Sequence, residues 1–142
     1  MGAIHRIGTG LAIALLLSCS AYGASTTGAV IRVNLSGSEE VPPATTSASG
    51  VGVFSVADDR TLTASVTTSG VVVTVAHIHE APAGKNGPII IPLVQSSENV
   101  WSVPPGVKLT DAQYASYMAG NLYFNMHSVA YRGGEIRGQI KP

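Results

Sequence analysis

The sequence predicts an all-β fold, an antiparallel, Greek-key-like β-sandwich of about seven short strands with one short helix. Valine, threonine, serine and glycine dominate the composition, whereas glutamate, lysine and leucine are scarce, which is typical of strands joined by many turns. Short apolar segments also recur along the chain, separated by glycine, proline, asparagine and aspartate. With 142 residues and no internal repeat, the chain is long enough for one domain with an N-terminal extension.

Residues 1–24 have the features of an export signal that is removed from the mature protein. A short positive region precedes the apolar run of residues 8–17, and the small residues that a signal peptidase needs follow at 21–24. The apolar run is shorter than the roughly 20 residues that span a bilayer. In the alternative, residues 16–19 form a partial bacterial lipobox, in which Cys19 becomes the lipidated first residue.

The folded domain is expected at residues 31–142, after a linker at 25–30. Because the single cysteine lies in the export signal, the domain has neither a disulfide nor a thiolate ligand. The chain has no net charge and only 11% charged residues, so it offers no basic field to nucleic acid or to an anionic membrane. We expect a secreted or periplasmic protein that binds no nucleic acid and meets a membrane only if Cys19 is lipidated.

Alternation of apolar and polar residues, bounded by turn residues, predicts the strands. In the clearest case Leu62, Ala64 and Val66 point inward, while serines and threonines point outward. The expected strands are residues 29–35, 50–56, 61–68, 71–79, 89–94, 122–127 and 135–140.

Prolines mark the segments that cannot be interior strands, because proline lacks the backbone donor of a ladder hydrogen bond. Pro42 and Pro43 predict an extended edge segment or a loop, and Pro92 places its strand at a sheet edge. Residues 95–106 are polar and contain prolines, which predicts a loop. Trp101 is expected to cap the core from this loop, with a role as a ligand platform as the alternative.

One short helix is predicted at residues 111–119 from its end signals. Thr110 and Gln113 have the spacing of a capping box, and Gly120 is a natural stop. The helix is expected to cover one end of the sheets with three large side chains, Tyr114, Tyr117 and Met118.

The three histidines of the domain lie on two of the predicted strands. Successive side chains of a strand point to opposite faces, so His77 and His79 share one face, as do Asn125 and His127. Neighbours on adjacent strands have Cβ atoms about 5 Å apart. If the two strands pair, the three imidazoles converge on the outward face, and we predict a metal site formed by His77, His79 and His127.

The ligand type restricts the metal. Imidazole suits zinc, copper, iron and nickel, and copper binds most tightly in the divalent series. In an exported protein without thiolates we expect copper, with zinc as the alternative, and three neutral imidazoles leave a coordination position open. In the competing interpretation the histidines are structural and donate hydrogen bonds to Asn125, Glu80 or backbone carbonyls.

Other chemistry has little support in the sequence. The acidic pairs Glu39-Glu40 and Asp58-Asp59 lie in turns, where carboxylates are expected to be solvated rather than to form an acid/base pair. In the last strand Ile136 and Ile140 are expected to point inward, and the outward Glu135 and Arg137 are interpreted as solvated charges, with support of the metal site as the alternative. We find no Gly-x-Ser-x-Gly elbow and no nucleotide-binding glycine loop.

The chain also carries an ordered series of short motifs, namely Leu35-Ser36-Gly37, Glu40-Val41-Pro42-Pro43, Ala76-His77-Ile78-His79, Gly84 with Asn86-Gly87-Pro88, Leu109-Thr110, Gly120-Asn121-Leu122-Tyr123, Asn125-x-His127-Ser128 and Gly134-Glu135-Ile136-Arg137-Gly138-Gln139. In this order they resemble the CHRD domain, which is named after chordin and also occurs alone in exported bacterial proteins. The resemblance covers residues 31–142. It implies a β-sandwich in an extracellular or periplasmic setting and no agreed biochemical activity.

A second resemblance is local. His77-Ile78-His79-Glu80 is similar to the His-x-His stretch that supplies two copper ligands in copper/zinc superoxide dismutases, and Asn125-x-His127 has the place of another copper histidine. The bridging histidine, the disulfide cysteines and the zinc loop of those enzymes are missing. We therefore assign no catalytic role from this resemblance. The predicted function is binding of copper or zinc by an exported protein. The alternative is a non-catalytic module that binds a protein or glycan of the envelope.

Overall fold

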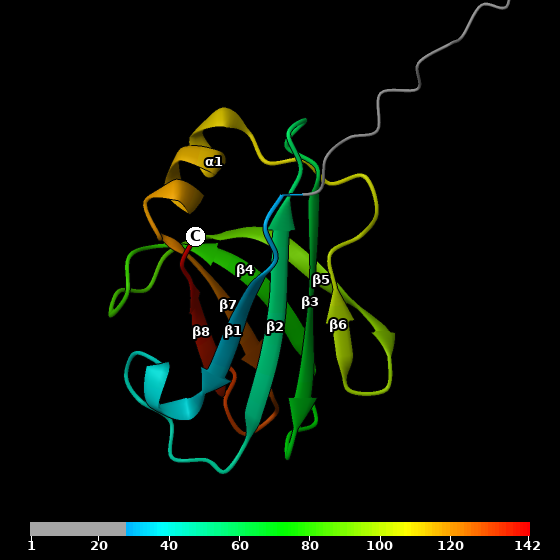
Figure 1. Cartoon of the computed structure of the whole chain (residues 1–142). Helices are drawn as coiled ribbons and strands as arrows, with labels where there is room; N and C mark the ends of the chain where they lie inside the picture. The colour runs from blue at the N-terminus through cyan, green and yellow to red at the C-terminus, as the bar shows by residue number, and fades with distance from the viewer. Residues whose placement is uncertain (1–27) are drawn as a thin grey trace, which may run out of the picture.

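The computed structural model describes residues 28–142, and over this part of the chain it shows a closed antiparallel β-barrel (Figure 1). Its strands are β1 Ile31–Ser36, β2 Ser49–Val56, β3 Leu62–Ser69, β4 Val75–Glu80, β5 Ile89–Ser97, β6 Val100–Ser102, β7 Leu122–His127 and β8 Ile136–Ile140. A 3-10 helix, η1 Gly37–Glu39, follows β1, and the α-helix α1 Asp111–Met118 connects β6 to β7. The predicted export signal and lipobox lie outside the described residues.

The strands follow one another around the barrel in the order β1-β2-β3-β6-β5-β4-β7-β8, and the segment β3-β6-β5-β4 has the order of a Greek key. The predicted all-β class with one short helix is confirmed, but the sandwich of about seven strands is wrong. β1 pairs with β2 along its whole length, and Ser36 at its end pairs with Arg137 of β8. The sheet therefore closes on itself instead of ending in two free edges.

The eighth strand lies where the sequence predicted a loop. β5 extends to Ser97, and after a two-residue turn β6 pairs with both β5 and β3. Trp101 lies on β6 opposite Val66, with 8% of its surface exposed, so it is a core residue of a strand and does not cap the core from a loop. Three residues are too few to show a period of two, which is why β6 was missed.

Pro92 lies on β5, between β4 and β6 in the barrel order. It is opposite His77 of β4, whereas the pairing of β5 with β6 begins only at Val94. At Pro92 the strand is therefore paired on the β4 side only, an arrangement in which a sheet tolerates proline. The predicted edge exists locally at this proline rather than along the whole strand.

The helix forms as predicted and covers one end of the barrel (Figure 1). The hydroxyl of Thr110 accepts from the backbone N–H of Gln113, and the Gln113 side chain accepts from the N–H of Thr110, which completes the capping box. Tyr117 packs against Phe54 inside the barrel mouth, with ring centroids 5.1 Å apart. Met118 is 54% exposed, so the prediction that it packs on the sheets is wrong.

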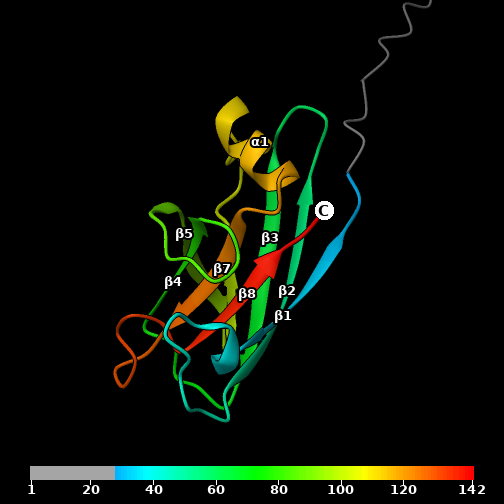
Figure 2. The ribbon, with the colours of Figure 1, turned by 90° about the vertical axis from the view of Figure 1, so that its left-hand side faces the viewer.

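Loops gather at the end of the barrel opposite α1 (Figure 2). The segment after η1 and the turn between β7 and β8 lie side by side there, and the Tyr131 hydroxyl donates to the Thr45 carbonyl across them at 2.6 Å. These loops are far apart in sequence, and together they cover part of the outer surface of β7 and β8.

The barrel interior is filled by side chains from every strand. Gly52 of β2 faces the Phe124 ring of β7 across this core. A Cβ atom at Gly52 would lie 2.7 Å from a ring carbon of Phe124, which is itself fully buried. The absence of a side chain at Gly52 therefore makes room for the aromatic ring.

We predict that Gly52→Ala destabilises the protein by about 1–3 kcal/mol, because the added methyl forces Phe124 out of its position. The free energy of unfolding from chemical denaturation measures the effect. Gly133→Ala is the control, since no atom lies within 4 Å of the Cβ position there. Equal stability of the two variants would contradict this account of the core.

Candidate metal centre

β4 and β7 pair in an antiparallel register that brings the three histidines together. His77 is opposite Asn125, and Val75 is opposite His127, so His127 is the diagonal neighbour of His77 on the same outward face. The ring centroid of His77 lies 5.0 Å from that of His127 and 5.5 Å from that of His79. The predicted pairing of the two segments and the shared face are therefore confirmed.

The distances between the nitrogens suit a small metal ion. One ligand atom of each histidine lies within 4.8 Å of those of the other two, and Nδ1 of His77 is 3.1 Å from Nε2 of His127. Two imidazole nitrogens bound at about 2.0–2.1 Å to one ion are separated by about 3–3.4 Å at bond angles near 90–110°. The His77–His127 pair already has this spacing. A pair at the 4.8 Å limit would need to close by about 1.4–1.8 Å.

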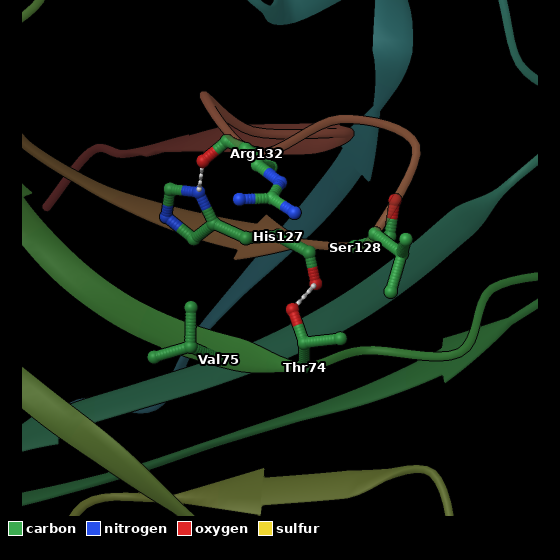
Figure 3. A pocket seen from close by; sticks show the side chains of 6 residues that line it. Thr74, Val75, His127, Ser128 and Arg132 are labelled. Carbon is green, nitrogen blue, oxygen red and sulfur yellow. Dashed lines mark hydrogen bonds between the residues drawn. The ribbon is translucent and has the colours of Figure 1, made fainter.

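Two of the rings are held in a fixed tautomer by backbone carbonyls. Nδ1 of His79 lies 3.0 Å from the Gly87 carbonyl oxygen, and Nδ1 of His127 lies 2.9 Å from that of Arg132 (Figure 3). A carbonyl oxygen only accepts, so both Nδ1 atoms carry the proton and both Nε2 atoms keep a lone pair. Metal-binding histidines commonly donate their second ring N–H in this way.

Nε2 of His79 has an unusual environment. It is buried, and among the side-chain nitrogens and oxygens of residues 28–142 it is the buried atom without a hydrogen-bond partner. Leaving a buried polar atom unpaired costs about 1–3 kcal/mol. A metal ion bound to this lone pair would remove that cost.

His77 and His79 are poor bases in the folded protein. Burial, followed by repulsion from the His127 and His79 rings, lowers the pKa of His77 to about 4. Burial also lowers the pKa of His79; the hydrogen bond to Gly87 opposes this effect, while the His127 ring and the Arg137 guanidinium add to it. Both rings are therefore neutral near pH 7, and protons compete little with a metal ion.

Tyr123 and Arg137 hold His79 in position. The Tyr123 ring stacks on His79, with centroids 4.9 Å apart and planes inclined by 13°. Its hydroxyl accepts from the Gly87 N–H at 3.1 Å, and the carbonyl of the same glycine fixes the His79 tautomer. The Arg137 guanidinium lies 3.5 Å from the centroid of the Tyr123 ring, a cation–π contact. A stacked layer of three side chains thus immobilises one of the candidate ligands.

Several charges predicted to be solvated are buried instead. Ile136 and Ile140 point inward as expected, but the outward Arg137 is only 1% exposed and Glu135 only 7%. The cause is the loops that cover this face: the Thr46 hydroxyl donates to Glu135 at 2.7 Å, and Arg137 donates to the Pro82 carbonyl and to Asn86. Strand alternation correctly placed these side chains on the outer face of the sheet. It cannot predict which loops cover that face.

Glu40 was also predicted to be solvated, and it is 6% exposed. Its Oε1 accepts from Nδ2 of Asn125, so Asn125 binds this carboxylate and not the histidines. Glu80, the other predicted histidine partner, accepts from the Ser116 hydroxyl. Burial raises the pKa of Glu40 to about 7, and the Asn125 hydrogen bond and the Arg137 charge oppose this rise. Glu40 belongs to one of the CHRD motifs, but no local pattern predicted its burial, which depends on contacts with β7 and with the β7–β8 turn.

A hollow of about 320 Å³ opens beside His127 (Figure 3). It is lined by Thr74, Val75, His127, Ser128, Val129 and Arg132. The Thr74 hydroxyl donates to the His127 carbonyl at 3.3 Å, which fixes the end of β7 at the floor of the hollow. An ion or small ligand can therefore approach the His127 side of the cluster from solvent.

We predict that Glu40→Gln stabilises the protein at pH 8 relative to the wild type and leaves its stability nearly unchanged at pH 4. The folded-state pKa of Glu40 is raised to about 7, so its favourable contribution is complete below the unfolded value of about 4.5 and is lost as pH rises through 7. The difference in unfolding free energy between the two proteins should grow by about 2–3 kcal/mol across this range.

Glu39→Gln is the matched control, because it removes the same charge from the exposed neighbouring residue. Chemical denaturation at a series of pH values gives the comparison. A parallel pH dependence for the wild type and Glu40→Gln would show that the Glu40 carboxylate is hydrated in the folded protein.

Comparison with known proteins identifies the domain. A profile of the CHRD domain matches residues 31–140. No match was found among the curated proteins or among the solved structures. In the described part of the chain, no helix has both the length and the apolar character that a membrane crossing requires. CHRD domains are generally extracellular modules. Since the profile covers most of the sequence, the chain belongs to the CHRD-domain family.

Proposed function

We propose that this is an exported CHRD-domain protein that binds a transition-metal ion through His77, His79 and His127. The observation that carries the proposal is the buried, unpartnered Nε2 of His79, which lies in a cluster with the two other imidazoles. The export step rests on the N-terminal sequence, with the lipid-anchored form at Cys19 as its variant.

Copper is the metal that we propose first, and zinc is the alternative. The cluster contains three neutral nitrogen donors and neither a thiolate nor a carboxylate, a set that suits both ions. Copper has the higher affinity for such a site in the divalent series. Three protein ligands leave a position for water or an exogenous ligand. We propose a role in metal binding, storage or delivery and assign no catalytic step.

The competing function is a non-catalytic module that binds an extracytoplasmic protein or glycan. The observation in its favour is the short contact between Nδ1 of His77 and Nε2 of His127, which a direct hydrogen bond explains without a metal. In that case the histidines hold β4 against β7, and their role is purely structural.

Metal retention separates the two functions. The purified protein, free of any histidine tag, is loaded with Cu(II) or Zn(II) and dialysed, and metal per chain is measured together with the copper EPR spectrum. We expect one ion per chain with nitrogen hyperfine structure. Loss of a residue that only hydrogen-bonds to a metal ligand typically weakens metal binding about 10–100-fold. We expect a larger loss of affinity when a ligand itself is removed, in each of the variants His77→Ala, His79→Ala and His127→Ala.

Glu98→Ala is the control, because it removes an exposed ligand-type side chain outside the cluster. Circular dichroism reports whether each variant is folded. Substoichiometric retention by the wild type, or equal retention by folded histidine variants, would favour the interaction module.

The pH dependence of retention gives a separate prediction. Protonated imidazole cannot bind a metal, but burial and mutual repulsion lower the pKa of His77 to about 4. We therefore expect the bound metal to be retained from pH 8 down to the normal histidine range near 6.5 and to be released between that value and about 4. Dialysis at stepped pH with metal analysis tests this. Release that is already half complete above pH 6.5 would contradict the buried, neutral state of the rings.

A further inference from the structure

A second hollow lies on the outer side of β7 and β8, and none of the three histidines lines it. It has a volume of about 260 Å³ and is lined by Glu40, Val41, Pro42, Pro43, Ala44, Tyr131, Gly133 and Gly134. The segment after η1 supplies one wall, and the turn between β7 and β8 supplies the other. The hydrogen bonds from Tyr131 to Thr45 and from Asn86 to the Val41 carbonyl fasten the first wall to its neighbours, so the hollow is a built feature of the fold.

One carboxylate oxygen of Glu40 is left for a ligand. Oε1 accepts from Asn125 and is covered by the backbone of Gly134, where a Cβ atom would lie 2.6 Å away. Oε2 has no hydrogen-bond partner among residues 28–142, yet it is not among the fully enclosed unpaired atoms. Glu40 lines the hollow and is 6% exposed, so Oε2, which is not fully enclosed, is the carboxylate oxygen available to a ligand there.

The carboxylate also lacks a bound counter-ion in the described part of the chain. The ion pairs there are Arg60–Asp111 and Lys108–Asp59, and neither involves Glu40. The charge of Arg137 acts on Glu40, but the hydrogen bonds of Arg137 go to neutral acceptors of Pro82, Asn86 and Gln139. A buried carboxylate that lines a hollow and has no ion-pair partner among residues 28–142 is an arrangement that a cationic ligand would complete.

We propose that this hollow binds a primary ammonium group carried on a short alkyl chain, with Glu40 as its anionic partner. Such a group occurs in free alkylamines and in lysine side chains, which share this chemistry. The walls suit the ligand because Val41, Pro42 and Ala44 offer apolar contact to methylene groups, and the Tyr131 ring can contact the cation. This site is independent of the metal proposal, since it contains none of the three histidines.

Binding should depend on pH through Glu40. Burial raises the pKa of this carboxyl to about 7, against the effects of Asn125 and Arg137. The other charged groups near the hollow are Glu39 on η1, Glu135 just before β8 and Arg132 in the β7–β8 turn. Only the ionised carboxylate attracts the ligand, so the apparent dissociation constant should be about thirtyfold lower at pH 8 than at pH 5.5.

The test is an NMR titration of the isotope-labelled protein with n-butylammonium, using n-butanol as the neutral probe of the same shape. We expect saturable shifts of the Gly133 and Gly134 amides and of the Asn125 side-chain amide with the cation alone. The carbon shift of the Glu40 carboxyl, followed against pH in the wild type, should show its pKa falling when n-butylammonium is bound. This measurement needs no substituted protein.

Glu40→Gln should weaken n-butylammonium binding about tenfold or more and abolish its pH dependence, whereas Glu39→Gln should leave both nearly unchanged. A peptide with one central lysine and blocked ends distinguishes the sources: tighter binding than n-butylammonium assigns a protein side chain, and equal or weaker binding assigns a free amine. The proposal is overturned if the cation gives no saturable shifts, if n-butanol binds equally well, or if Glu40→Gln binds like the wild type.

Discussion

The antiparallel register between β4 and β7 is the constraint on which the histidine cluster depends. His77 and His79 alternate with Ile78, and His127 alternates with Met126, so each strand has one polar and one apolar face. A slip of one residue in either strand would send its histidines into the barrel and its core residues outward. The burial of Ile78 and Met126, both fully enclosed, therefore fixes the position of the imidazoles outside.

A second layer of structure lies over this outer face. Loops between the strands bring backbone carbonyls to His79 and His127, and they enclose Arg137 and Glu40 as well. Covering this face removes its ionisable groups from water, which disfavours their charged forms. The effect lowers the pKa of a histidine and raises the pKa of a carboxyl group. His77 and His79 stay neutral and the Glu40 carboxyl holds its proton to higher pH, for the same physical reason.

Arg137 connects the two polar sites of this layer. Its guanidinium lies on Tyr123, which stacks on His79, and its charge also acts on Glu40. A delocalised guanidinium tolerates such burial because several carbonyl and amide oxygens accept its N–H groups. The same cation thus disfavours protonation of His79 and favours ionisation of Glu40.

The sequence by itself determined the β class, the capped helix, the CHRD motifs and the shared face of the histidines. These features depend on local signals: a period of two, a capping box and short ordered motifs. Tertiary structure decided the closure of the barrel through β1 and β8, and it decided the burial of Glu40 and Arg137. Glu40 meets Asn125 from 85 residues away, and periodicity can assign a residue to a face but cannot tell which distant loop will cover that face.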